Sequence, residues 1–226
     1  MCLSLAVNLA MKCSHDDSTP EFWTSEAAHL RRIFDRQIQS RIDEAETKHF
    51  SVFALASQPL LILLGSLFTD KVDAAVYQPH REPKTWQWQA HPKGFRFKVV
   101  EPTTTERDPT LVISLSAKIH HDRVKTIVGD QHSIWDLTID DCHNDFLQSE
   151  AQLRSFRQEA RKLMARIEAA HPKAKQLNIF PAMPAACAVE LGRIRMPKAA
   201  LPWAIYDQNN KHQRFIPSLT IGKKHE

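Results

Sequence analysis

The sequence predicts an α/β fold built from two similar halves. Strand-like and helix-like segments alternate along the chain, and SVFALASQPLLILLG (residues 51–65) has a counterpart in NIFPAMPAACAVELG (residues 178–192). We therefore expect a duplicated element, although two unrelated strand–helix units could share this pattern. The aligned pairs are Gly65 with Gly192, Phe53 with Phe180, Leu64 with Leu191 and, after a short insertion, Tyr77 with Tyr206.

The first half should begin with a long helix. Thr19 suits the N-cap and Pro20 the first helical position, and apolar residues at helical spacing continue the pattern to about Glu46. The helix is followed by the pattern of a strand–helix–strand unit. Its expected elements are a strand at 49–55, a turn at 56–58, a helix opened by Pro59 and a strand at 72–77.

The segments between the halves, and the second half itself, continue the alternation. We expect strands at TWQWQ (85–89), FRFKVV (95–100) and TLVISLSA (110–117), then a helix in HHDRVKTIVG that ends at Gly129. The second half then repeats the order of the first. Its expected elements are a long helix between Leu147 and Ile167, a strand at 176–180, a helix opened by Pro184 and a strand at 202–207.

Each half should form a small Rossmann-like layer, because parallel strands joined through a helix require a right-handed crossover. The chain contains no charged linker, low-complexity tract or glycine–serine spacer between the halves. We therefore expect a single body over residues 1–226, with a first half at 18–144 and a second half at 145–226.

Composition indicates a soluble globular protein without fixing its function. Of the 226 residues, 42% are hydrophobic and 25% are charged, with a net charge of +4 and a pI near 8.9. This mild basicity suits an anionic small molecule or a nucleic acid but establishes neither. The sequence lacks the dinucleotide fingerprint, the phosphate loop, G-x-S-x-G and H-E-x-x-H, so it gives no sign of the enzyme classes that use them.

The cysteines favour a reduced, cytoplasmic interior. The four of them form no C-x-x-C pair, and we expect no signal peptide before them. Cys13 with His15, or Cys142 with His143, lacks a second pair to complete a tetrahedral set, so we expect no metal site. The apolar run at 53–68 is shorter than the roughly 20 residues of a membrane span and is interrupted by polar residues, so we expect no span.

Two proline-containing corners form the candidate binding site. In an open parallel sheet, ligands bind at the carboxyl ends of strands, beside the positive N-termini of helices. ALASQP (54–59) and FPAMP (180–184) should occupy that place and offer backbone N–H groups, while Ser57 and Gln58 add side-chain groups. The alternative is that each proline only sets the first turn of its helix.

A loop rich in polar and aromatic residues follows the first unit. YQPHREPKTWQW (77–88) places Arg81 between two prolines, where its guanidinium is either solvated or bound to a phosphate. Trp86 and Trp88 could stack on bases for roughly 1–3 kcal/mol each, although at least one of them is expected in the core. In the second half, Asp207, Gln208 and Asn209 are available for base edges.

Three long stretches of this chain resemble the SAVED domain, the cyclic-oligonucleotide sensor of bacterial anti-phage signalling (CBASS): residues 49–88, 111–119 and 177–209. The resemblance implies two CARF-like halves in one chain around a single pocket, with a cyclic dinucleotide of the cyclic GMP-AMP type favoured over a trinucleotide. The residues implied at the pocket are Leu55, Ala56, Ser57, Gln58, Gln78, His80, Arg81, Trp86, Ser114, Ser116, Phe180, Pro181, Ala182, Met183, Pro184, Tyr206, Asp207 and Gln208.

The resemblance also implies a ligand-sensing module rather than an enzyme. In this family, ligand binding makes SAVED copies associate and activates a fused or separate effector, such as an HNH nuclease or a TIR domain. The sequence shows no such effector, since His143-Asn144 is isolated from any HNH-like zinc ribbon. The resemblance implies no cofactor and no membrane partner.

The sequence leaves two alternatives to sensing. A CARF-like ring nuclease could cleave its own cyclic ligand by positioning it against Ser57, His80 and Arg81. A nucleic-acid binder could use Arg193, Arg195 and Lys198. Neighbours such as Glu190 balance those charges, so a solvated helix face explains them without DNA.

Overall fold

The computed structural model describes residues 6–10, 16–44, 47–105, 107–130, 132–197, 200–209 and 211–222. Its helices are α1 (Pro20–Phe34), the π-helical turn η1 (Asp35–Gln39), α2 (Ser40–Asp43), α3 (Gln58–Phe68), α4 (His121–Val128), α5 (Glu150–Ala170) and α6 (Ala185–Arg193). Its strands are β1 (Phe50–Phe53), β2 (Ala74–Tyr77), β3 (Lys98–Val100), β4 (Asp108–Ser114), β5 (His132–Thr138), β6 (Leu177–Ala182), β7 (Trp203–Asn209) and β8 (Arg214–Ile221).

Six strands form one sheet, in the order β3-β5-β4-β6-β7-β8. The four central strands run parallel, whereas β3 and β8 pair antiparallel at the two edges. A separate sheet contains the parallel strands β1 and β2. The two expected strand–helix–strand units are therefore confirmed, as β1-α3-β2 and β6-α6-β7. The fold is mixed α/β.

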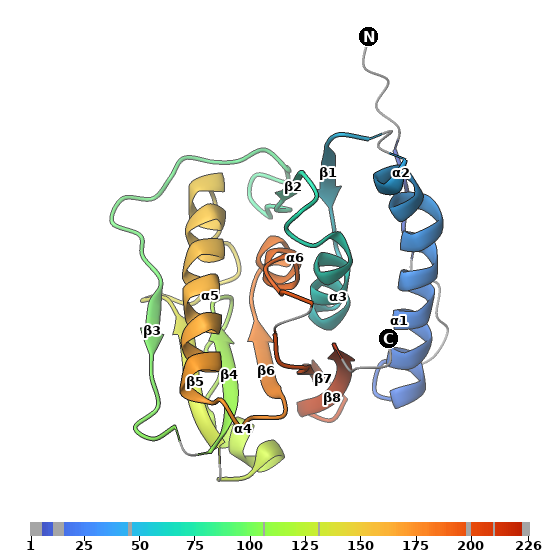
Figure 1. Cartoon of the computed structure of the whole chain (residues 1–226). Coiled ribbons are helices and arrows are strands. Elements are labelled where there is room, and N and C mark those ends of the chain that lie inside the picture. The colour runs from blue at the N-terminus through green and yellow to red at the C-terminus, as the bar shows by residue number, and fades with distance from the viewer. Residues whose placement is uncertain are drawn as a thin grey trace.

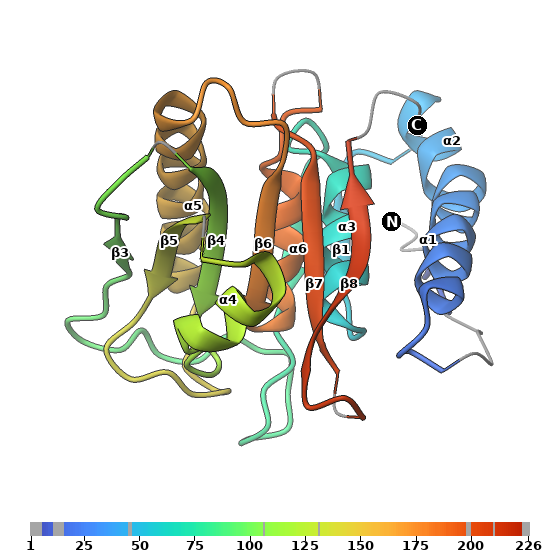
Figure 2. The same cartoon turned by 90° about the horizontal axis from the view of Figure 1, so that it is seen from below.

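Helices cover the two faces of the large sheet unequally. α5, α6 and α3 lie on one face, and the small β1–β2 sheet lies beyond α3 and α6 (Figure 1). α1 packs beside α3 and β8. On the opposite face, the described part of the chain contributes α4 (Figure 2). Since α4 and α6 connect parallel strands on opposite faces, the sheet is wound in both directions.

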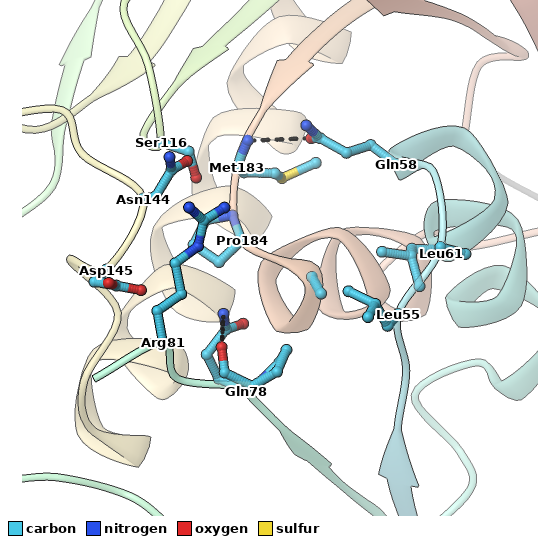
Figure 3. A pocket seen from close by; sticks show the side chains of 13 residues that line it. Leu55, Gln58, Leu61, Gln78, Arg81, Ser116, Asn144, Asp145, Met183 and Pro184 are labelled. Atoms are coloured by element: carbon cyan, nitrogen blue, oxygen red, sulfur yellow. Dashed lines mark hydrogen bonds between the residues drawn. The ribbon is translucent and has the colours of Figure 1, made fainter. Parts of the chain in front are cut away.

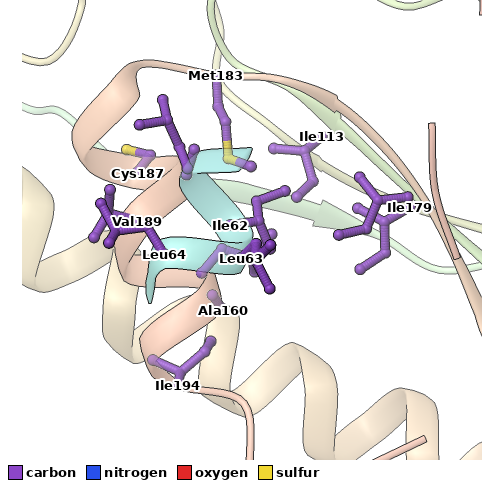
Figure 4. Packing of buried hydrophobic residues seen from close by; sticks show 14 of the residues in the cluster. Ile62, Leu63, Leu64, Ile113, Ala160, Ile179, Met183, Cys187, Val189 and Ile194 are labelled. Atoms are coloured by element: carbon purple, nitrogen blue, oxygen red, sulfur yellow. The ribbon is translucent and has the colours of Figure 1, made fainter. Parts of the chain in front are cut away.

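The centre of the molecule is the contact between α3 and α6. At Gly65 of α3 an added Cβ would overlap the carbonyl oxygen of Val189, and at Gly192 of α6 it would overlap that of Ile62. The two helix backbones can approach this closely because neither glycine carries a side chain. Ile62, Leu63 and Val189 are fully buried around the contact (Figure 4).

Two stacked aromatic pairs match across the halves. The rings of Phe53 and Tyr77, on β1 and β2, stack with centroids 4.6 Å apart, and those of Phe180 and Tyr206, on β6 and β7, stack at 4.3 Å. These pairs and the reciprocal glycine contacts favour the internal duplication, which stays a prediction. The division at 144/145 also stays a prediction, and the large sheet contains strands from both sides of it.

Local signals fixed most helix ends as expected. The Thr19 hydroxyl accepts a hydrogen bond from the Phe22 N–H (3.4 Å), and Pro20 opens α1. α4 ends at Gly129, whose φ is +83°. α5 begins with a capping box that was not predicted: the Ser149 hydroxyl accepts from the Gln152 N–H, and the Gln152 side chain accepts from the Ser149 N–H.

One expected strand was wrong, and two strands were missed. Residues 85–89 form no strand; only Thr85 makes an isolated bridge, to His80, and Trp86 and Trp88 pack on other rings instead. β5 and β8 were not expected at all. The first helix continues through η1 and α2 to Asp43, and Glu46 lies outside the described residues.

Two expected absences can be examined only in the residues that the structure describes. Among these, no helix has the length and apolar character that crossing a membrane requires. The same residues hold no cluster of three or more His, Cys, Asp or Glu side chains suited to a metal ion. Cys13, His15 and Lys198 lie outside the described residues.

Candidate functional site

A cavity of about 260 Å³ lies where the two proline-containing corners meet. The segments that line it follow the carboxyl ends of β1, β2, β4, β5 and β6, all of which belong to parallel pairs. This is the position at which open α/β sheets bind ligands. The structure brings together there eight of the predicted residues: Leu55, Ala56, Gln58, Gln78, Arg81, Ser116, Met183 and Pro184.

Two glutamine side chains tie the corners to each other. The Gln58 Oε1 accepts a hydrogen bond from the Met183 N–H (3.1 Å), and the Gln78 Oε1 accepts one from the Ala186 N–H (3.1 Å), as Figure 3 shows for the first. Both bonds connect elements of the first half to the N-terminal end of α6. These two hydrogen bonds fix the positions of the two corners relative to each other.

The cavity offers two features that favour an anion. The N-termini of α3 and α6 both reach it, and their positive dipole ends favour negative charge. Arg81 extends into the cavity (Figure 3), and within the described residues its guanidinium makes no hydrogen bond or ion pair. A phosphate group is the ligand part that fits a guanidinium beside helix N-termini.

Five lining residues were missed: Leu61, Pro79, Asn144, Asp145 and Ala185. Asn144 and Asp145 matter most, because they add polar groups from the loop that follows β5. In the part of the chain that the structure describes, neither side chain makes a hydrogen bond or ion pair. The signal that could have found them was β5 itself, since its carboxyl end lies at the same edge of the sheet as those of β4 and β6.

Ser57 and His80 lie close to the cavity in sequence but do not line it. His80 is only 8% exposed and lies edge-on to Trp88, with ring centroids 5.9 Å apart. Burial lowers the pKa of His80, and the charge of Asp145 opposes this shift only in part, so the imidazole is neutral near pH 7. Of the three residues considered for a ring nuclease, only Arg81 lines the cavity.

Five further predicted residues lie behind or beside the cavity. Phe180 is fully buried between Tyr206 and Phe215, and Pro181 and Ala182 complete β6 beside it. The Ser114 hydroxyl accepts a hydrogen bond from the Ile119 N–H (3.0 Å). Trp86 packs edge-on against Phe53, at 5.3 Å between centroids.

The end of β7 diverges from the cavity, because this strand continues into a hairpin with β8 as far as Asn209. Within the hairpin, Gln208 accepts a hydrogen bond from Arg123 of α4. Burial raises the pKa of Asp207 to about 7, and the nearby charge of Asp17 adds to the shift. Tyr206, Asp207 and Gln208 therefore lie outside the lining.

The basic residues considered for nucleic acid do not form an exposed helix face. Arg193 is 4% exposed and donates to the carbonyls of Val72 (2.8 Å) and Ala74 (2.9 Å), and it pairs with Glu190 at 2.9 Å. Arg195 is 5% exposed. The expectation of a solvated helix face was wrong, and both side chains are buried in the fold.

The sequence model of SAVED, the SMODS-associated and fused to various effectors sensor domain, matches residues 30–221. The chain belongs to the SAVED family. This match spans both corners and every residue that lines the cavity.

Solved structures confirm the SAVED/CARF fold. The chain is similar to the Acinetobacter baumannii Cap4 SAVED/CARF-domain receptor with 2'3'3'-cAAA (16% identity, TM-score 0.64) and with 3'3'3'-cAAA (17%, 0.64), covering 91% of this chain and 44% and 45% of those chains. The Moraxella osloensis Cap4 receptor is similar at 14% identity and a TM-score of 0.57, covering 90% and 43%. The chain thus spans less than half the length of these receptors. Comparison with curated proteins finds no match.

Proposed function

We propose that this SAVED domain is a sensor that binds a cyclic oligonucleotide in the cavity between its two corners. The observation that carries the proposal is the position of Arg81. Its guanidinium lies without a protein partner in the described residues, inside a cavity that two helix N-termini also reach. A ligand with phosphates around a ring satisfies all of these groups at once.

A cyclic trinucleotide is the ligand that we propose to test first. The Acinetobacter baumannii Cap4 receptor is described with two cyclic trinucleotides, and nothing in the comparisons supports a preference for a dinucleotide. The cavity of about 260 Å³ is smaller than the roughly 300–1,000 Å³ of pockets that enclose drug-sized ligands. One part of the ring would therefore enter the cavity, while the rest covers the rim at Leu55, which is 81% exposed.

We further propose that ligand binding promotes association with other SAVED copies and activates a fused or separate effector nuclease or TIR domain. Two exposed apolar side chains support this step, Leu55 in the lining of the cavity and Phe53 at the end of β1. Phe53 is 55% exposed and Leu55 is 81% exposed. A ligand seated beside them would extend this apolar surface with its bases and offer a larger face to a second copy.

Isothermal titration calorimetry with a panel of cyclic di- and trinucleotides tests the proposal. At least one of them should bind with a Kd in the micromolar range or below. Arg81→Ala should weaken the binding of that ligand by about 1.5 kcal/mol, or roughly tenfold. Arg96→Ala is the matched control, because Arg96 lines a different cavity of about 310 Å³. No binding by any member of the panel would remove the proposal.

A further inference from the structure

Asp145 is an unexpected group in a cavity for an anionic ligand. Asp145 lies on the loop that follows β5 and lines the same cavity as Arg81 (Figure 3). A carboxylate repels phosphates and can only accept hydrogen bonds. Its place in the lining therefore requires that the part of the ligand opposite it presents N–H or O–H donors rather than a phosphate.

The acceptor oxygens of Asp145 are available to a ligand. The side chain is half-buried, and within the described residues it makes no hydrogen bond and no ion pair. The nearby His80, which is neutral near pH 7, forms no hydrogen bond with it. The lining glutamines are less available, since the Oε1 atoms of Gln58 and Gln78 already accept backbone N–H groups.

Base edges differ in how well they match two carboxylate oxygens. Guanine presents two adjacent donors on its Watson–Crick edge, the N1–H and the exocyclic N2 amine. Adenine and cytosine each present one amine next to a ring acceptor, which would face the second carboxylate oxygen and repel it. A protein reads an extruded base through this edge, and a bidentate match is worth roughly 1–3 kcal/mol of discrimination, or about 5- to 150-fold.

We propose that Asp145 is a specificity-determining residue that selects a guanine base in the ligand. This inference rests on the proposed function and makes it narrower, because it predicts a ring that contains at least one guanylate. Asn144, which has both a donor and an acceptor, lies next to Asp145 in the lining and can complete the contact at the guanine O6.

A ribose 2′-hydroxyl is the competing donor, and a matched ligand series separates it from the base. The probes are 3'3'3'-cAAA, the same ring with one adenine replaced by guanine, the same ring with hypoxanthine in that position, and the guanine ring with its 2′-hydroxyls removed. Hypoxanthine keeps the N1–H and lacks only the N2 amine. Each ring is titrated by calorimetry into the unchanged protein, so the comparison is independent of any variant's folding.

The guanine ring should bind at least about tenfold more tightly than 3'3'3'-cAAA, with the hypoxanthine ring between them. Asp145→Asn should lower the affinity for the guanine-containing ring about tenfold and remove its preference over 3'3'3'-cAAA, because the amide replaces one acceptor by a donor. Asp141→Asn is the control, since Asp141 lies on the same loop, lines the other cavity and has a side chain that is 92% exposed. It should leave all affinities unchanged.

Other outcomes overturn the inference in distinguishable ways. Equal binding of the adenine and guanine rings would exclude base selection by Asp145 while leaving the sensor role intact. A large loss on removing the 2′-hydroxyls, with no effect of the base, would assign the carboxylate to the ribose. Failure of every ring in this series to bind would remove the inference, and failure of the wider panel of cyclic di- and trinucleotides as well would remove the proposed function.

Discussion

Gly65 and Gly192 lie at the point where the backbones of α3 and α6 touch, each against a carbonyl of the other helix. An added Cβ would overlap Val189 O at one glycine and Ile62 O at the other. Both corners of the cavity are the N-terminal ends of these two helices. The spacing of the helices therefore also sets the spacing of the corners.

Replacing either glycine should destabilise the fold strongly. Gly65→Ala and Gly192→Ala would each force the helices apart, at a cost of about 3 kcal/mol, whereas alanine normally improves a helix by roughly 1 kcal/mol. Urea unfolding followed by circular dichroism measures the change. At the control position Gly94, which has φ +70°, an added Cβ meets nothing within 4 Å, so alanine there should cost only about 1 kcal/mol. Equal losses at all three positions would contradict the close contact.

A charge placed in the cavity should weaken ligand binding without unfolding the protein. Gln58→Glu keeps an acceptor for the Met183 N–H, and its negative charge suits the N-terminus of α3. The same charge repels a phosphate by about 1–1.5 kcal/mol, so affinity should fall roughly tenfold. Gln87→Glu, at an exposed position outside the lining, makes the same charge change and should have little effect. If the two variants bind alike, the cavity is not the site.

Loss of the Gln78 side chain should lower stability. It is 6% exposed, and its Oε1 accepts the buried N–H of Ala186 (3.1 Å). Gln78→Ala leaves that donor without a partner, at a cost of about 1–3 kcal/mol. Thermal unfolding of the variant, beside an exposed control such as Gln87→Ala, measures the loss. A melting temperature equal to that of the unchanged protein would show that the hydrogen bond contributes nothing.

The stability of the protein should depend on Asp207 above neutral pH. Burial, with Asp17 nearby, raises its pKa from 3.8 to about 7, so the folded state favours the protonated carboxyl. The stabilisation that comes with this shift is present below pH 4 and is lost as the pH rises through 7. Allowing for partial exposure, Asp207→Asn should be more stable than the unchanged protein by about 2 kcal/mol at pH 8, and by nearly nothing at pH 4.

Unfolding curves of Asp207→Asn and of the unchanged protein at pH 4, 6 and 8 measure this difference in stability. Asp141→Asn serves as the control because its carboxylate is 92% exposed. A stability difference that stays constant over the pH range would mean that Asp207 ionises as it does in the unfolded chain.

The cyclic oligonucleotide should remain uncleaved when it is incubated with the protein. Of the groups considered for cleavage, Ser57 and His80 do not line the cavity, so Arg81 would act without them. Chromatography of the ligand after prolonged incubation should recover the cyclic form. A linear product that disappears in Arg81→Ala would instead support the ring nuclease.

Helix starts could be predicted from the sequence because their signals are local. Thr19 and Pro20, and likewise Pro59 and Pro184, set the first turn of a helix through their own backbone geometry. The strand–helix–strand units followed from the apolar patterns on each side. Thus both corners could be located from these patterns, while lining residues outside the corners, such as Gln78 and Ser116, were expected only from the resemblance to the SAVED domain.

The missed strands have physical reasons. β5 contains His132 and Asp136, which interrupt its apolar pattern; Asp136 is nevertheless buried, and its carboxylate accepts a hydrogen bond from His121 (3.0 Å). β8 contains Pro217, which argues against a strand but is tolerated because β8 lies at an edge. Conversely, the alternating pattern of residues 85–89 predicted a strand, but its tryptophans pack on the rings of Phe53 and Tyr77.

These errors explain what was missed at the site. Without β5, the loop that carries Asn144 and Asp145 had no expected place at the carboxyl edge of the sheet. Without β8, nothing indicated that β7 would continue into a hairpin and carry Asp207 away from the corners. Long-range strand pairing decides both positions, and a single sequence holds little information about it.

A structure of the chain with a bound cyclic trinucleotide tests the central claim most directly. The account predicts ligand between the corners, with a phosphate oxygen within hydrogen-bond distance of Arg81 and part of the ring against Leu55 and Pro184. Ligand bound elsewhere, for example in the cavity beside Phe95 and Arg96, or no bound ligand at saturating concentration, would contradict it.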